Sequence, residues 1–264
     1  MSKLILIDGN NILFRAYYAL PSSLTTRAGE PINAIYGFVS MLLKIITDLK
    51  PTHIALCFDR EEPTFRKKEY KNYQSQRTPT EDALKSQFKK ARDVARAFNI
   101  DAYELPGYEA DDIIGTIAKK SRWVEEYKSK SKKKTSTLTP LRSPALIDEV
   151  VIVTGDRDMF QLVNSKVKVY FPIKGLSNTE LLGEKGVEER LGVSPFQIVD
   201  YKALVGDSSD NYPGVPGIGP KTAQDLLGRF GTFQGVYKHL GDVSKNVAKK
   251  LVEGKKEGEL SLKL

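Results

Sequence analysis

The sequence predicts an α/β protein whose mostly parallel central sheet is flanked by helices. Short, continuously apolar runs occupy residues 3–7, 52–58 and 150–154. Runs of Val, Ile and Leu without polar alternation are typical of strands that are buried on both faces of a parallel sheet. Apolar residues at helical spacing lie between these runs, as in residues 33–48. Strands that alternate with helices predict a parallel α/β sheet.

Further elements follow in chain order. We expect strands at residues 100–105 and 167–171, and helices at 81–98, 109–127 and 221–229. A Lys- and Ser-rich segment at about 128–148 lacks core-forming residues and is predicted to be a flexible inserted loop. From residue 176 the chain changes to short helices and Gly/Pro turns. We therefore expect a core domain at 1–175 and a smaller helical subdomain at 176–264.

The composition excludes several classes of protein. The chain has 264 residues, a net charge of +8 and a pI of about 9.3, which favours a polyanionic partner. A single cysteine, Cys57, excludes an internal disulfide framework and a multi-cysteine zinc site. Two distant histidines, His53 and His239, argue against a histidine metal cluster. No apolar run is long enough for a membrane span or a signal peptide, so we expect a cytoplasmic protein with no membrane partner.

Acidic residues directly follow three of the predicted strands. Asp8, Asp59 and Asp156 come at the ends of apolar runs. In an open α/β sheet the ligand site lies at the carboxyl ends of the strands, so these carboxylates are predicted to meet in one crevice. An acid at each of three buried strand ends is unfavourable unless it is used.

Six further acids accompany this group. They are Glu109, Asp111 and Asp112 at the start of a helix, Asp158 beside Asp156, and Asp207 and Asp210 in a Gly-rich turn. Nine like charges cannot share a site unless cations neutralise them or several take up protons. Oxygen ligands without His or Cys favour Mg²⁺ or Mn²⁺, and so many carboxylates suggest two-metal phosphoryl-transfer chemistry. For Asp111, Asp112 and the two turn aspartates, helix capping and turn formation remain open as structural alternatives.

A Gly-rich turn at residues 214–222 precedes the last of the predicted helices. It is not a Walker phosphate loop, because a proline separates Gly219 from Lys221 and no strand precedes the turn. Gly217 and Gly219 let the backbone approach a phosphate, and Lys221 and Thr222 open a helix whose N-terminal amides point at it. We interpret this pattern as a helix-hairpin-helix clamp on a duplex backbone, with a plain tight turn as the alternative.

A basic segment follows Asp59. Residues 60–98 hold eleven basic residues against six acids, with Tyr70 and Tyr73 among them. Basic residues interleaved with aromatic rings suit a single nucleic-acid strand, because cations contact phosphates and rings stack on bases. The segment is therefore predicted to guide a single strand, and a solvated helical hairpin is the alternative.

Together these motifs resemble the 5′-nuclease family, which comprises the 5′→3′ exonuclease domain of bacterial DNA polymerase I and the related flap endonucleases. The matching stretches are LILIDGNNILFRAYYAL, ALCFD, PGYEADDIIGTIA, VVIVTGDRDMFQLV and ALVGDSSDNYPGVPGIGPKTA. The resemblance covers nearly all of the chain outside about 128–148. The resemblance implies a PIN-like or resolvase-like nuclease core, a helical arch, here at about 60–98, and a C-terminal helix-hairpin-helix subdomain.

The resemblance also implies two metal sites. Asp8, Asp59, Glu109 and Asp111 would gather one ion with Asp112 close by, and Asp156, Asp158, Asp207 and Asp210 would gather the other. Family members also bind a monovalent cation, usually K⁺, at the hairpin, here around Gly217 and Gly219. Their arch admits the 5′ single strand.

One departure from the family pattern lies in the arch. Family members of the polymerase type carry Tyr-Lys and then an arginine three residues after the lysine, whereas this chain has Tyr73, Gln74 and Arg77. Glutamine cannot supply a cation to the scissile phosphate, so Lys71 or Arg77 would carry that role. We expect Lys71 and Arg77 to be catalytic, and the further DNA contacts to include Arg15, Arg66, Tyr73 and Gln74.

We therefore expect a structure-specific 5′ nuclease, a two-metal phosphodiester hydrolase that acts as a 5′→3′ exonuclease and a 5′-flap endonuclease. Its substrate would be DNA with a 5′ flap, overhang or nick, RNA primer–DNA included, and its products a 5′-phosphate and a 3′-hydroxyl. The resemblance implies replication primer removal and repair, by a monomer fused to or working with a DNA polymerase. Two alternatives remain: a slow or inactive junction-binding protein, and a PIN-type ribonuclease.

Overall fold

The computed structural model describes residues 2–130, 147–175 and 178–264, so most of the insertion predicted at about 128–148 lies outside the described residues. The chain divides into two units. Unit 1 comprises Met1–Glu61 and Thr80–Gly183, and unit 2 comprises Glu62–Pro79 and Glu184–Leu264. The segment Glu62–Pro79 therefore interrupts unit 1 in the sequence but belongs to unit 2. In this structure the arch predicted at about 60–98 is divided between the two units.

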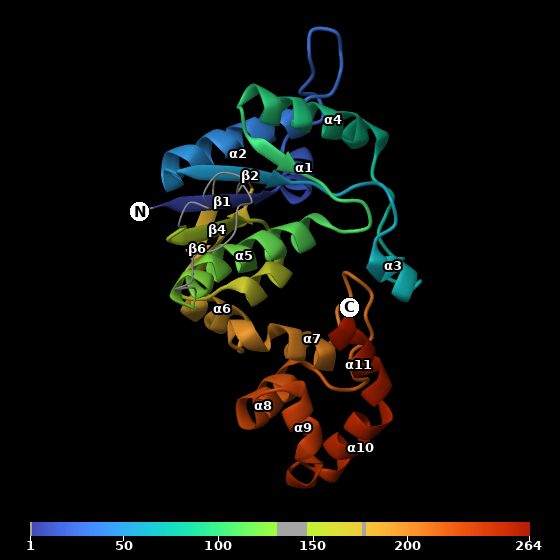
Figure 1. Ribbon diagram of the computed structural model, residues 1–264. Helices are drawn as coiled ribbons and strands as arrows, with labels where there is room; N and C mark the ends of the chain where they lie inside the picture. The colour runs from blue at the N-terminus through green and yellow to red at the C-terminus, as the bar shows by residue number, and fades with distance from the viewer. Residues whose placement is uncertain (1, 131–146, 176–177) are drawn as a thin grey trace. The chain divides into compact units, whose positions relative to one another are not determined.

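A six-stranded sheet forms the centre of unit 1 (Figure 1). Its strands are, in spatial order, β3 (Asp101–Tyr103), β2 (His53–Cys57), β1 (Lys3–Asp8), β4 (Glu149–Val153), β5 (Val167–Lys174) and β6 (Asn178–Leu182). All neighbouring strands are parallel except β5 and β6, which are antiparallel. The mostly parallel sheet predicted from the apolar runs is confirmed. The sequence did not indicate β6, because this edge strand is polar and mostly exposed.

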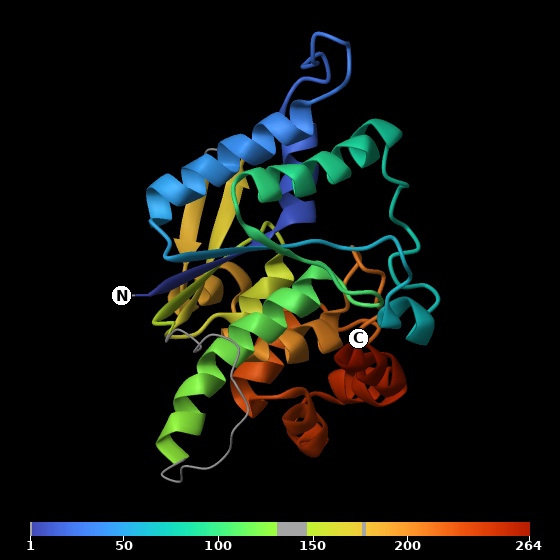
Figure 2. The same cartoon turned by 45° about the horizontal axis from the view of Figure 1, so that its top comes forward.

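Helices cover both faces of this sheet (Figure 2). On one face lie α1 (Gly9–Ala19), α2 (Asn33–Leu49) and α4 (Asp82–Ala97), and on the other lie α5 (Ala110–Lys130) and the 3₁₀ helix η1 (Arg157–Leu162). The first face encloses the main core, in which Phe38, Ile45 and Leu56 are completely or almost completely buried. Helix α4 buries Leu84 and Ala91 in this core, so it is a packed element of unit 1 and not a solvated hairpin.

The strand order indicates at which edge of the sheet a ligand site is expected. From β1 the chain adds β2 and β3 on one side and then returns to add β4 and β5 on the other side. The order therefore reverses beside β1. In open α/β sheets ligands bind outside the carboxyl ends of the strands at such a reversal, so the residues that follow β1 and β4 lie at the expected ligand site.

Unit 2 is helical in the part of the chain that the structure describes. Its elements are α3 (Phe65–Glu69), α6 (Glu184–Leu191), η2 (Pro195–Gln197), α7 (Ile198–Val205), α8 (Pro220–Phe230), α9 (Phe233–Lys238), η3 (Leu240–Asp242), α10 (Lys245–Glu253) and α11 (Lys255–Lys263). Helix α8 confirms the helix predicted at 221–229. Leu226, Phe233 and Leu251 are buried among these helices. Across the described ranges, the helices lack the combination of length and apolar character that crossing a membrane requires.

Candidate metal site and DNA-binding hairpin

Asp8 is the buried carboxylate at the end of β1. It caps α1 by accepting a hydrogen bond from the Asn11 backbone N–H at 3.0 Å, and it accepts a second from the Thr154 hydroxyl at 2.9 Å. Both donors are neutral. Burial raises the pKa of Asp8 from 3.8 to about 7, and the nearby charges of Asp59 and Asp156 add to this effect. The two hydrogen bonds lower the pKa but do not outweigh burial. The position therefore favours a cation.

Asp59 follows β2 and connects the strand end to α5. Its Oδ1 accepts a hydrogen bond from the Ala110 backbone N–H at 2.7 Å, at the N-terminus of that helix. Its own N–H donates to the Asn10 side chain at 3.2 Å. A carboxylate at a helix N-terminus is favoured by the backbone dipoles as well as by the hydrogen bond.

The loop after β4 holds Asp156 in a third position at the same edge. Asp156 accepts a hydrogen bond from the Asp158 backbone N–H at 2.8 Å and caps η1. The preceding Gly155 donates its N–H to the Asn11 side chain at 2.7 Å. A Cβ atom at Gly155 would lie 2.9 Å from Asn11 Oδ1, so a larger residue there would displace the Asn11 amide that binds this loop.

Two acids lie in the first turn of α5, and Asp112 has a local structural role there. Asp111 and Asp112 occupy the first turn, and Asp112 accepts a hydrogen bond from the Glu109 backbone N–H at 3.0 Å. Helix capping, the alternative left open by the sequence, thus describes Asp112. Within the described part of unit 1, no three acidic side chains bring their oxygens within 4.8 Å of one another. Like charges repel, which favours this spread.

The donor set of unit 1 fits a hard divalent cation. Asp8, Asp59 and Asp156 place carboxylate oxygens at the carboxyl edge of one sheet, and Asp8 is buried with two neutral hydrogen-bond donors, the Asn11 N–H and the Thr154 hydroxyl. Oxygen-only ligand sets suit Mg²⁺ and Mn²⁺. These residues, with Glu109 and Asp111, therefore remain the candidate ligands.

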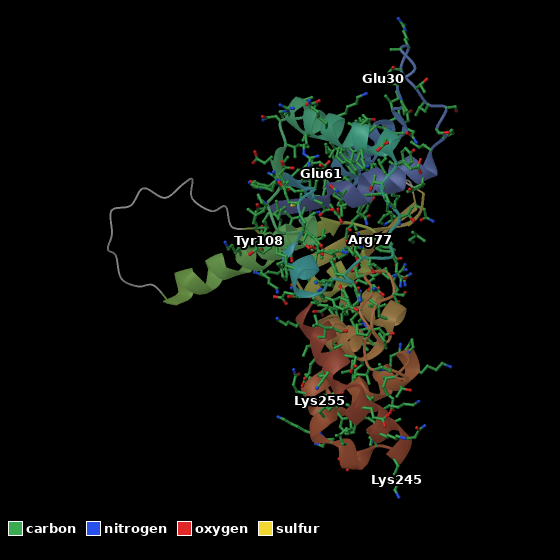
Figure 3. The ribbon with its side chains drawn as sticks, turned by 90° about the vertical axis from the view of Figure 1, so that its right-hand side faces the viewer. Glu30, Glu61, Arg77, Tyr108, Lys245 and Lys255 are labelled. Carbon is green, nitrogen blue, oxygen red and sulfur yellow. The ribbon has the colours of Figure 1, made fainter. Side chains whose placement is uncertain are left out.

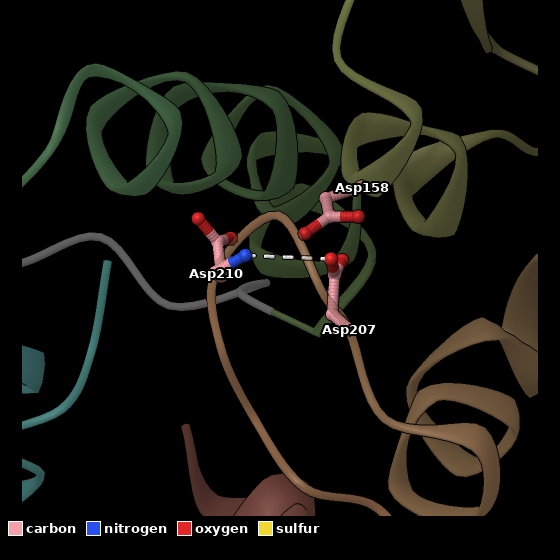
Figure 4. A group of neighbouring side chains, drawn as sticks. All are labelled: Asp158, Asp207 and Asp210. Atoms are coloured by element: carbon pink, nitrogen blue, oxygen red, sulfur yellow. Dashed lines mark hydrogen bonds between the residues drawn. The ribbon is translucent and has the colours of Figure 1, made fainter. Parts of the chain in front are cut away.

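Unit 2 holds the remaining two acids on the loop between α7 and α8 (Figure 4). The Asp210 backbone N–H donates to Asp207 Oδ1 at 3.4 Å, and the two carboxylates offer oxygens within 4.8 Å of each other. Both acids have cationic partners, because Lys202 contacts Asp207 and Arg77 contacts Asp210 at 2.7 Å. Burial would raise the pKa of Asp207, but the Lys202 ammonium and Ser209 outweigh it and hold that pKa below 3.8.

The predicted arch residues belong to different environments. Lys71 is exposed, and the Arg77 side chain is 56% exposed. Arg66 lies half-buried, where its Nε donates to the Leu264 backbone oxygen at 2.8 Å. Tyr73 is only 3% exposed and stacks on Tyr212, so its ring is covered in this conformation. Its predicted DNA contact stays a prediction.

Two further groups of predicted DNA contacts lie in unit 1. Arg15 is half-buried, burial lowers its pKa, and its guanidinium lies 3.0 Å from where a Cβ atom of Gly155 would stand, beside the loop that carries Asp156. Several basic residues of α4 instead pair with acids of unit 1. These pairs are Lys85–Asp82, Lys90–Glu30, Arg92–Glu104 and Arg96–Asp93. The basic character of residues 80–98 is thus partly neutralised within the unit.

The hairpin between α7 and α8 has the expected features of a backbone clamp. Gly217 has a φ of +78°, a conformation that favours glycine, and Gly219 caps α8. Lys221 is exposed and Thr222 half-buried in the first turn of that helix. The Lys250 ammonium donates to the Gly217 carbonyl oxygen at 3.2 Å. Lys245 and Lys255 project from the same unit (Figure 3).

Sequence reasoning missed the neutral residues that organise the acidic edge. Asn10 and Asn11 receive hydrogen bonds from the residues after β2 and β4, and Thr154 binds Asp8. Their signal was present in the polar run that follows β1 and in the threonine that ends the apolar run at 150–154. The sequence prediction of the site was based on carboxylates because they carry the charge. The two amides and the hydroxyl fix the positions of these carboxylates.

Two family models match adjoining parts of the chain. The 5′-3′ exonuclease N-terminal resolvase-like domain matches residues 3–192, and the 5′-3′ exonuclease C-terminal SAM fold matches residues 193–264. The chain belongs to the 5′-3′ exonuclease family. The resemblance drawn from the sequence motifs is therefore confirmed.

Similar curated members of this family are bacterial DNA polymerases I. The polymerase of Caldicellulosiruptor bescii is 40% identical over 264 residues, which is 99% of this chain and 28% of that protein. The polymerase of Bacillus subtilis is 39% identical over 263 residues, which is 99% of this chain and 27% of that protein. The chain thus spans about a quarter of the length of these relatives.

Solved structures of nucleases share the fold of this 5′-3′ exonuclease family member. The T5 5′-exonuclease with bound zinc aligns with a TM-score of 0.73 and 21% identity, over 98% of this chain and 88% of that one. A bacteriophage T5 D15 flap endonuclease in complex with DNA and metal ions aligns with a TM-score of 0.74 and 21% identity, over 98% and 87% of the two chains. At this identity the likeness establishes the fold.

Proposed function

We propose that this chain is a structure-specific 5′ nuclease that hydrolyses DNA phosphodiesters at 5′ flaps, overhangs or nicks and acts as both a 5′→3′ exonuclease and a flap endonuclease. The observation that carries the proposal is the acidic carboxyl edge of the unit 1 sheet. There Asp8, Asp59 and Asp156 follow three parallel strands, and Asp8 is buried with neutral hydrogen-bond donors. Membership of the 5′-3′ exonuclease family and the metal-containing structural neighbours support the same reading.

The chain's own residues supply the positions for hydrolysis. Asp8, Asp59, Glu109 and Asp111 are proposed to hold one Mg²⁺ or Mn²⁺ with Asp112 close by, and Asp156, Asp158, Asp207 and Asp210 a second. When bound, two such ions supply a nucleophile at neutral pH and stabilise charge on the phosphoryl group and the leaving oxygen. The products would be a 5′-phosphate and a 3′-hydroxyl.

Basic residues are proposed to place the substrate and stabilise its charge. Arg77 or Lys71 would contact the scissile phosphate, and Arg15 and Arg66 would contact neighbouring phosphates. The hairpin at Gly217, Gly219, Lys221 and Thr222 would grip the duplex backbone without reading its sequence. A role in primer removal and repair, in the cytoplasm and as a monomer fused to or working with a DNA polymerase, stays a prediction.

The hairpin bears on the predicted K⁺ site. A carbonyl oxygen has two lone pairs, so Gly217 has room for one partner besides the Lys250 ammonium. Two cations on one oxygen repel each other. Because of this repulsion, we expect a bound K⁺ ion and the Lys250 ammonium to compete for the Gly217 carbonyl oxygen. The Lys250 ammonium is a cation that the chain itself already supplies to the hairpin.

A cleavage assay tests the proposed function. A labelled 5′-flap duplex should be cut in Mg²⁺ and left intact in EDTA, and Asp156→Ala should lower the rate by about 10³-fold. Asp93→Asn is the matched control, because Asp93 is an exposed acid on α4 of the same unit. Its rate should equal that of the unmodified chain.

Three other outcomes would lead to other conclusions. Cleavage that persists in EDTA would rule out the metal mechanism. Tight flap binding without cleavage at long times would favour the junction-binding alternative. Faster cleavage of plain single-stranded RNA than of the flap would favour the PIN-type ribonuclease.

A further inference from the structure

The segment of residues 70–77 lies against the loop that carries Asp210, and both belong to unit 2. The Gln74 backbone N–H donates to the Asp210 carbonyl oxygen at 3.0 Å. The Asn211 side chain donates to the Asn72 carbonyl oxygen at 2.8 Å and to the Ser75 hydroxyl at 3.1 Å. Backbone and side-chain hydrogen bonds together fix the segment on this loop.

Three side chains converge on the Asp210 carboxylate. Oδ1 accepts hydrogen bonds from Arg77 Nη2 at 2.7 Å and from Gln74 Nε2 at 3.1 Å, and Oδ2 accepts one from the Tyr212 hydroxyl at 3.2 Å. Asp210 is 7% exposed. One cation, one neutral amide and one neutral hydroxyl therefore surround a buried carboxylate.

The contact is reinforced by a pair of rings and by two unusual backbone conformations. Tyr73 and Tyr212 stack with their centroids 6.0 Å apart and their planes at 10°. Gln74 and Asn211 have φ angles of +52° and +64°. Non-glycine residues rarely adopt this left-handed conformation, and it persists where surrounding contacts over-determine it. Both residues make hydrogen bonds between the segment and the loop, Gln74 to Asp210 and Asn211 to Asn72 and Ser75.

We propose that Gln74 is a positioning residue that, with Arg77, holds the Asp210 carboxylate in place while leaving it, among the described residues, one cationic partner, Arg77. This inference rests on the proposed function, in which Asp210 is a Mg²⁺ or Mn²⁺ ligand. A lysine at this position would give the carboxylate a second cation at hydrogen-bond distance. That cation would oppose a divalent ion, because it repels the ion and occupies the same ligand oxygen.

The first test measures Mn²⁺ binding to the free protein by the loss of the Mn²⁺ paramagnetic resonance signal, alongside the Mg²⁺ concentration for half-maximal flap cleavage. Gln74→Lys should weaken Mn²⁺ binding about fivefold and raise the half-maximal Mg²⁺ concentration by a similar factor. Gln76→Lys is the matched control. It adds the same charge to the same segment, but Gln76 contacts the Asn211 amide oxygen at 3.2 Å and not the carboxylate.

A double variant separates charge from structure. Gln74→Lys combined with Arg77→Gln returns the carboxylate to one cation and one amide, so it should recover most of the Mn²⁺ affinity lost in Gln74→Lys. Gln74→Met keeps the side-chain length without charge and should lower the affinity less than Gln74→Lys. Thermal unfolding of each variant confirms that folded protein is compared.

Two results would overturn the inference. One is an unchanged Mn²⁺ affinity in folded Gln74→Lys, including the case in which that variant simply cleaves faster at the same Mg²⁺ dependence. The other is an equal loss in Gln74→Met, which would make charge irrelevant. If the unmodified chain cut no flap while Mn²⁺ binding responded as expected, the proposed function would fail and the positioning role would stand.

Discussion

The two edges of the unit 1 sheet treat their acidic residues in opposite ways. At the amino edge, Glu149 begins β4 and binds two lysines, Lys168 at 2.7 Å and Lys3 at 3.2 Å. Burial would raise the pKa of Glu149, but these ammonium groups outweigh it and hold that pKa below 4.5. At the carboxyl edge, Asp8 receives hydrogen bonds from neutral donors, and burial and acidic neighbours raise its pKa to about 7.

The difference shows how a structural acid can be told from a functional one. A carboxylate that only stabilises the fold is neutralised by cations of the same chain, as the partly buried Glu149 is. A buried carboxylate that lacks such partners and faces other acids lowers the stability of the fold. Such destabilising carboxylates are common at functional sites. The comparison leads to three predictions about single substitutions.

The largest effect is expected at Asp8. Asp8→Asn should lower flap cleavage by about 10³-fold, because an amide is a poor ligand for a hard divalent ion. It should also raise the free energy of unfolding by about 1 kcal/mol, because it removes a buried charge that neutral donors face. Cleavage rates and urea denaturation check the two parts. A loss of stability would show that the charge of Asp8 supports the fold, and the contrast between the edges would be wrong.

An intermediate effect is expected at Asn11. Asn11→Ala removes the amide oxygen that binds the Gly155 N–H, which frees the loop that carries Asp156, so cleavage should fall about tenfold. Asn164→Ala is the matched control at the amino edge, where Asn164 Oδ1 accepts from the Val167 N–H at 3.1 Å. Both variants should lose about 1 kcal/mol of stability. Equal cleavage by the two folded variants would contradict the assigned role of Asn11.

The smallest effect is expected at Glu149. Glu149→Gln should lower the free energy of unfolding by about 1 kcal/mol near neutral pH and leave cleavage unchanged. Because the folded-state pKa of Glu149 lies below 4.5, its stabilisation is present above pH 4.5 and is lost as the pH falls through the folded-state pKa. Urea denaturation of both proteins across this range should show the stability difference shrinking in acid. A difference that grows in acid would reverse the sign of the argument.

The sequence predicted the part of the fold that depends on local pattern. Continuous apolar runs located β1, β2, β4 and β5, and the broad apolar face of residues 33–48 located α2. Helix α1 was not predicted, because it begins with Gly9, Asn10 and Asn11, which are residues that favour turns. Its N-terminus is capped by the Asp8 side chain.

The candidate site was predictable only as a set of acids. Their place after buried strands followed from the topology of parallel sheets, and family membership supports that interpretation. The contacts of Gln74 and Arg77 with Asp210 were not predictable, because they join residues more than a hundred positions apart through a left-handed backbone at Gln74. Local pattern carries no information about such pairs.

The assignment of Glu62–Pro79 to unit 2 has a consequence for how this protein can be divided or recombined. The two family models meet between residues 192 and 193, but the folding units do not separate there, since the chain passes from one unit to the other at three places. A gene fragment that ends at residue 192 would encode a stretch without the helices it packs with. A chimaera that exchanges the C-terminal region between relatives would have to exchange this stretch as well. The part of the gene that encodes unit 2 is therefore discontinuous.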